Sequence, residues 1–113
     1  MKDRLTGAAT KQQPIPIIPE PGARRDVADW LIQRIGDAPI ADDIAARREL
    51  GISRYGTPLS ANNGRDALVD AYQEVLDLLV YLAQDDIENK RKIISDLTRD
   101  TLDIALRIRG RLW

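Results

Sequence analysis

The sequence predicts an all-α protein, a bundle of about four helices with an extended N-terminal arm. Apolar residues recur at helical spacing in four segments, and turn residues such as glycine and proline stand between them. No stretch alternates between apolar and polar residues as a half-buried strand would. The chain has 113 residues, enough for one small domain with a modest core, so assembly into oligomers is expected to add stability.

Residues 1–22 are predicted to form the arm, and residues 23–113 the helical domain. Proline at this density favours extended or polyproline II chain over helix. The isoleucines between the prolines can still dock on a neighbouring surface. The prolines are Pro14, Pro16, Pro19 and Pro21.

The first two helices are expected at about 23–35 and 39–50. Pro39 stands in the first turn of the second helix and Gly51 follows its end, which is the usual asymmetry of helix termini. A polar loop rich in turn residues is expected at 51–63.

The third and fourth helices are expected at about 64–84 and 86–108, with Asn63 as the N-cap of the third. The apolar residues of the third helix cover an arc of about 200°, whereas an ordinary surface helix buries a stripe of little more than ~100°. This helix should therefore be central in the bundle or lie at a subunit interface, which predicts a homo-oligomer, a dimer or tetramer.

Composition excludes several classes of chemistry. The chain has no cysteine and no histidine, so it lacks disulfides, thiolate nucleophiles, Ser–His–Asp triads and imidazole metal sites. It has 18 acidic and 17 basic residues, and a metal bound by them would be a hard cation, Mg²⁺ or Mn²⁺.

The charge balance and hydropathy exclude other partners. A net charge of −1 argues against binding to a nucleic acid polymer. No run of about 18 apolar residues exists to cross a membrane, and residues 1–11 lack the apolar core of a signal peptide. We therefore expect a cytoplasmic protein.

The third helix carries an acidic stripe. At 100° per residue, four carboxylates and a tyrosine share about 80° of its circumference. No lysine or arginine shares this arc to offset the like-charge repulsion. Two interpretations stay open, a solvated face and a set of carboxylates that converges on a metal ion. The residues are Asp66, Asp70, Glu74, Asp77 and Tyr81.

Three motifs in residues 40–84 resemble short phage and bacterial MazG-like proteins, of the all-α nucleoside triphosphate pyrophosphohydrolase superfamily. They are Arg54-Tyr55-Gly56-Thr57-Pro58-Leu59, then Asn63-Gly64-Arg65-Asp66, then Glu74-x-x-Asp77-Leu78-Leu79 with Tyr81-Leu82. The resemblance implies a dimer or dimer of dimers, with Mg²⁺ or Mn²⁺ held by carboxylates. It also implies hydrolysis of a nucleoside triphosphate to the monophosphate and pyrophosphate. Some phage members remove dGTP, which makes dGTP an expected substrate.

Glu74 and Asp77 match the second half of the family signature, E-x-x-D, and are therefore expected to be catalytic and to bind the metal. The first half, E-E-x-x-E, is not intact. Glu49 and Asp70 are taken as the remaining metal ligands. A rival register treats Asp70 and Glu74 as the first half of the signature, and Asp100 and Asp103 as the second.

The resemblance places the substrate-binding residues around the loop. Arg54 and Arg65 are candidates for contact with phosphates, and Tyr55, Asn62 and Asn63 for contact with the base. The incomplete signature leaves an alternative function open, a non-catalytic helical interaction or regulatory protein. A less selective dNTP pyrophosphatase is the enzymatic alternative.

Overall fold

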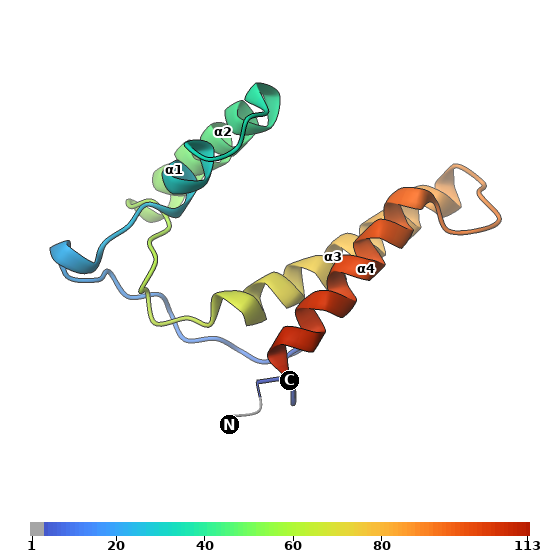
Figure 1. Ribbon diagram of the computed structural model, residues 1–113, viewed down its shortest axis with the longest axis horizontal. Coiled ribbons are helices and arrows are strands. Elements are labelled where there is room, and N and C mark those ends of the chain that lie inside the picture. The colour runs from blue at the N-terminus through green and yellow to red at the C-terminus, as the bar shows by residue number, and fades with distance from the viewer. Residues whose placement is uncertain (1–3) are drawn as a thin grey trace. The chain divides into compact units, whose positions relative to one another are not determined.

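The computed structural model describes residues 4–113, which form two compact units. One unit is Ile15–Gly64, and the other joins the described residues up to Pro14 with Arg65–Trp113. Every regular element in 4–113 is helical, so the predicted all-α class is confirmed (Figure 1). None of these helices is long and apolar enough to span a lipid bilayer. The first three residues of the predicted arm lie outside the described part of the chain.

The unit Ile15–Gly64 is built on a pair of helices, α1 (Val27–Ile32) and α2 (Ala38–Tyr55), which pack against each other. Helix α1 is shorter than predicted because Pro21–Ala23 forms a separate 3₁₀ turn, η1. The Asp26 side chain then caps α1 by accepting a hydrogen bond from the backbone N–H of Asp29.

Helix α2 continues past the predicted stop at Gly51, so that prediction is wrong. The helix ends at Gly56, whose φ of 82° is a left-handed conformation that glycine adopts without steric cost. A glycine inside a helix costs roughly 1 kcal/mol but does not end it. Arg54 and Tyr55 therefore lie on the last turn of α2, and the loop begins after them.

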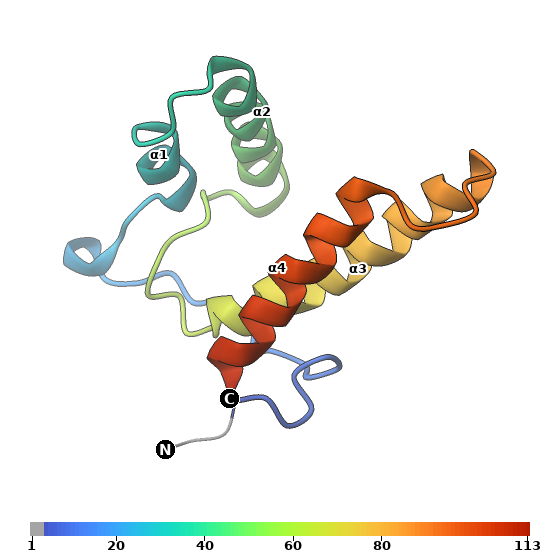
Figure 2. The ribbon, with the colours of Figure 1, turned by 45° about the vertical axis from the view of Figure 1, so that its right-hand side comes forward.

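The second unit is a helical hairpin. Helices α3 (Ala67–Glu88) and α4 (Asp96–Leu112) lie side by side and antiparallel (Figure 2). Ala8, Val69 and Leu112 form its buried centre. The first part of the predicted arm therefore joins this unit, and a backbone hydrogen bond from Arg4 to Leu112 holds its beginning.

The N-cap of helix α3 is Asp66, not the predicted Asn63. The Asp66 carboxylate accepts hydrogen bonds from the backbone N–H groups of Leu68 and Val69 and forms an ion pair with Arg4 at 2.7 Å. Asp66 is therefore an N-cap residue and not a member of an unpaired acidic stripe. The Arg4 side chain lowers the pKa of Asp66 to about 2, and the two backbone N–H groups add to the shift.

Helix α4 begins ten residues later than predicted, after Ser95, because Asp86 closes the connection between the two helices. The Asp86 side chain is buried and accepts hydrogen bonds from the Ser95 N–H at 3.1 Å and the Thr98 hydroxyl at 2.8 Å. These bonds lower the pKa of Asp86 to about 2. The buried Asp86 carboxylate needs these hydrogen-bond donors, so the chain between α3 and α4 turns where Ser95 and Thr98 can reach it.

Acid is expected to weaken the hairpin unit. Asp66 and Asp86 have folded-state pKa values below their usual 3.8, so their stabilising effect is complete above pH ~4 and is lost as the pH falls towards ~2. The Asp66 part is worth about 1–2 kcal/mol after allowance for solvent screening. Thermal unfolding of wild type and Asp66→Asn between pH 6 and ~2 tests this, because asparagine keeps the cap but loses the charge. An identical pH dependence in both proteins would contradict the assignment to Asp66.

Candidate functional site

The acidic residues of α3 fall into two groups. Glu74 and Asp77 lie about one turn apart on the exposed side of the helix, and neither makes a hydrogen bond or ion pair with any residue in 4–113. Because no hydrogen bond or ion pair with the described residues holds them, both carboxylates are available to a ligand.

Asp70 is already paired. The Arg65 guanidinium donates to both oxygens of this carboxylate, Nε at 2.9 Å and Nη2 at 2.7 Å, and the Gln13 side chain adds a third bond. The Arg65 hydrogen bonds lower the pKa of Asp70 below its usual range. The prediction that no basic residue offsets the acidic stripe is therefore wrong at Asp70, because the Arg65 side chain folds back onto this carboxylate. Asp70 would have to exchange Arg65 for a metal ion in order to act as a ligand.

Glu49 does not belong to the same unit of the chain as Asp70, Glu74 and Asp77. It belongs to the unit Ile15–Gly64, on α2, and forms an exposed ion pair with Arg48 at 2.7 Å. No three acidic residues among 4–113 gather into a group that could hold a metal ion. The pair Glu74 and Asp77 still fits Mg²⁺ in kind and number, because this ion is commonly held by one or two carboxylates together with substrate phosphates and water.

The residues of the rival register lie on α4. Asp100 and Asp103 are both exposed, and Asp103 forms an ion pair with Arg107 one turn along the helix at 3.1 Å. An i,i+4 pair of this kind is typical of a solvated helix face.

Arg54 and Arg65, the arginines expected to contact phosphate, differ in the contacts that they already make with other residues. Arg54 is exposed at the end of α2 and has no partner among the described residues. Arg65 is bonded to Asp70 and donates to the backbone carbonyl of Pro14 at 2.8 Å. Arg65 would have to break these contacts in order to bind a phosphate. Arg54 could bind a phosphate without breaking any hydrogen bond or ion pair to a described residue.

The two asparagines tie the loop to the arm and to Ala23, the residue that follows the arm. The Asn62 amide donates to the Ala23 carbonyl at 2.9 Å, and its backbone has a positive φ of 61°. The Asn63 carbonyl accepts from the Ile17 N–H at 2.9 Å. Asn62 therefore has a structural function in the loop, which the sequence pattern alone did not indicate.

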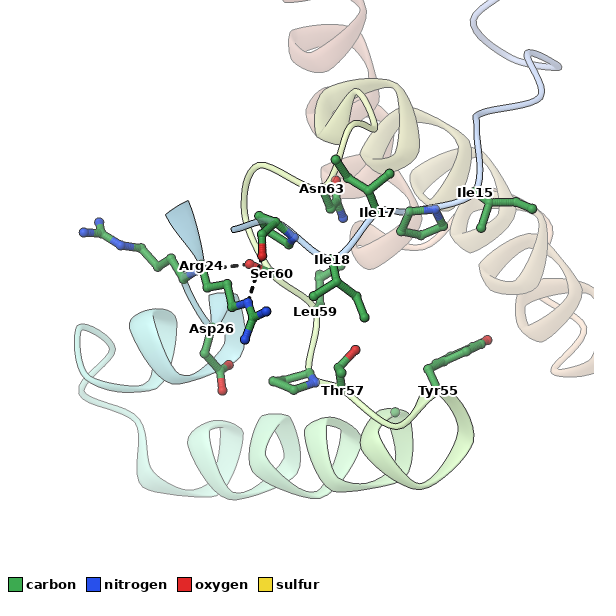
Figure 3. A pocket seen from close by; sticks show the side chains of 15 residues that line it. Ile15, Ile17, Ile18, Arg24, Asp26, Tyr55, Thr57, Leu59, Ser60 and Asn63 are labelled. Carbon is green, nitrogen blue, oxygen red and sulfur yellow. Dashed lines mark hydrogen bonds between the residues drawn. The ribbon is translucent and has the colours of Figure 1, made fainter. Parts of the chain in front are cut away.

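A groove of about 720 Å³ opens within the unit Ile15–Gly64, between the arm and the segment that follows α2. Two of the predicted substrate-binding residues, Tyr55 and Asn63, line it. Figure 3 shows Ile18 of the arm, with Thr57 and Tyr55 from the end of α2 and the loop, around this hollow. The sequence indicated that the isoleucines among the prolines could dock on a neighbouring surface, but it did not indicate that the arm would line a groove together with Tyr55 and Asn63.

A comparison with protein-family models, with curated proteins and with solved structures finds no match to this chain. The MazG-like resemblance therefore stays a prediction carried by its motif residues.

Proposed function

We propose that this protein is a metal-dependent nucleoside triphosphate pyrophosphohydrolase, which converts a (d)NTP and water into the (d)NMP and pyrophosphate. The observation that carries the proposal is which carboxylates of α3 already have a partner and which do not. Asp66, Asp70 and Asp86 are each bound by an arginine, whereas Glu74 and Asp77 are exposed and unpaired within 4–113. Their i,i+3 spacing also matches the family half-signature.

The reaction needs groups that this chain has. A carboxylate must orient or deprotonate the attacking water, a task that we assign to Glu74 or Asp77. Cations must balance the charge on the leaving pyrophosphate, and Arg54 is an exposed guanidinium without a partner among residues 4–113. When bound, Mg²⁺ or Mn²⁺ supplies charge neutralisation at the phosphates. None of these tasks requires histidine or cysteine.

A homo-oligomer, a dimer or tetramer, is part of the proposal. The hairpin unit leaves many large apolar side chains exposed on both helices, and surfaces of this kind mark interaction sites. Covering them with a second copy would also add to a core that is small in each chain. The largest on the helices are Leu78, Val80, Tyr81, Ile87, Leu97, Leu102, Ile104 and Leu106.

A substrate screen tests the proposed function. The purified protein is incubated with each NTP and dNTP in Mg²⁺ or Mn²⁺, and the products are separated by ion exchange. We expect monophosphate and pyrophosphate in equal amounts, with dGTP the substrate that the resemblance favours. Release of orthophosphate with a diphosphate would indicate a different cleavage, and no turnover of any nucleotide would contradict the proposal.

The same exposed apolar residues favour a second candidate, a non-catalytic helical interaction protein. Thermal unfolding with Mn²⁺ and dNTPs separates the two functions, because a ligand that binds only the folded state raises Tm. An enzyme should show this rise, whereas a purely structural module should not.

A further inference from the structure

The groove is built by one unit of the chain alone. Every residue that lines it belongs to the unit Ile15–Gly64, whereas Glu74 and Asp77 belong to the other unit. The arm forms one wall and is fixed there, because the Ile17 N–H donates to the Asn63 carbonyl at 2.9 Å. The groove is therefore a cavity of the folded unit, and its ligand follows from the side chains of that unit.

The walls of the groove are mostly aliphatic and exposed. Ile15 is 88% exposed, Ile18 65% and Leu59 62%, and proline side chains of the arm extend the same apolar wall. Covering such a surface is favourable in proportion to the apolar area that is removed from water. Branched aliphatic side chains make an irregular wall, and an unbranched chain with several rotatable bonds can follow an irregular wall closely. These walls favour a flexible hydrocarbon chain as the occupant.

The groove also carries an uncompensated positive charge. The Arg24 Nε donates to the carbonyl of the buried Pro19 at 2.8 Å, which anchors the guanidinium. Its two terminal nitrogens make no hydrogen bond with a described residue. The only carboxylate in the lining, Asp26, is ion-paired with Arg48 at 2.7 Å. Arg24 is therefore able to pair with a carboxylate of a ligand, whose two oxygens match the fork of a guanidinium.

We propose that the groove is a binding site for a small amphiphile, a hydrocarbon chain that ends in a carboxylate, with the carboxylate on Arg24. Figure 3 shows Arg24 and Tyr55 on opposite sides of the hollow, with Ile18 and Leu59 between them, so the chain extends from Arg24 over these apolar side chains. A volume of about 720 Å³ lies in the range of small-molecule sites, ~300–1,000 Å³. This site is additional to the proposed hydrolysis and does not depend on it.

The test measures binding of three probes to the full chain by calorimetry. Octanoate has both the hydrocarbon chain and the carboxylate, octanol has the same chain without the charge, and acetate has the carboxylate without the chain. Wild type should bind octanoate about tenfold more tightly than octanol, because only octanoate pairs with Arg24. Acetate should give no measurable binding, because a single exposed ion pair contributes little.

Variants separate the two parts of the site. Arg24→Gln should weaken octanoate binding about tenfold and leave octanol binding unchanged. Leu59→Ser and Ile18→Ser should each weaken the binding of both probes about tenfold, because each removes apolar contact with the chain. Arg47→Gln and Ile40→Ser change exposed residues of α2 outside the groove, so these matched controls should bind both probes like wild type.

Three results would overturn the inference. Octanoate that does not bind to wild type would exclude the amphiphile, and equal affinity of wild type and Arg24→Gln for octanoate would exclude the carboxylate contact. If octanoate does not bind and Leu59→Ser lowers the oligomeric mass, a second copy of the chain occupies the groove instead. Release of pyrophosphate from a nucleotide bears on the proposed function alone, so the two proposals succeed or fail separately.

Discussion

Changing Glu74 to Gln or Asp77 to Asn is expected to reduce pyrophosphate release at least ~100-fold, the lower end of what a positioned acid or base contributes. Both side chains are exposed and make no hydrogen bond or ion pair with residues 4–113, so neither amide should disturb the helix. The far-ultraviolet circular dichroism of both variants should therefore match wild type. A small gain in stability without metal is also expected, because like charges one turn apart repel each other.

Two further variants make this result specific. Glu88→Gln changes an exposed carboxylate on the last turn of α3 whose partner is Gln84, and it should keep full activity. Asp100→Asn distinguishes the rival register and should also be active. Full activity in Glu74→Gln or Asp77→Asn would remove these residues from the site, and inactivity of Asp100→Asn with an active Asp77→Asn would favour the rival register.

The second large effect concerns assembly. Light scattering at micromolar concentration is expected to give a dimer or tetramer, and Val80→Lys should shift the mass towards that of a single chain. Val80 is 69% exposed on α3, so lysine fits the isolated chain, but a charge in an apolar interface is costly. The expected change is from a stable oligomer to a predominantly monomeric protein.

Gln84→Lys is the matched control for assembly. Gln84 lies on the same helix, is exposed and polar, and bonds to Glu88, so lysine there should leave the oligomer intact. A wild-type mass of one chain would contradict the assembly, and an unchanged oligomer in Val80→Lys would exclude this part of α3 from the interface.

The sequence by itself determined the helical class and the approximate position of each helix. These follow from local patterns, because apolar residues three and four apart share one helix face wherever the helix lies. The same local information failed at the ends of the helices. Gly51 resembled a stop signal and Asn63 a cap, but the chain continues through Gly51 to Gly56 and starts the next helix after Asp66. Several residues near each boundary had the chemistry to end or begin a helix, and local pattern could not choose among them.

Only the tertiary structure decided which carboxylates of α3 are free. Arg4 lies 62 residues from Asp66, and Gln13 lies 57 from Asp70, so no helical periodicity reveals either contact. The arm likewise forms a wall of the groove because the Ile17 N–H donates to the Asn63 carbonyl, a contact between segments that are distant in the sequence. A helical pattern fixes neighbours within one or two turns, whereas pairing between distant segments depends on how the whole chain packs. For that reason Glu74 and Asp77 could be named from the sequence, but their separation from Asp66, which pairs with the distant Arg4, could not.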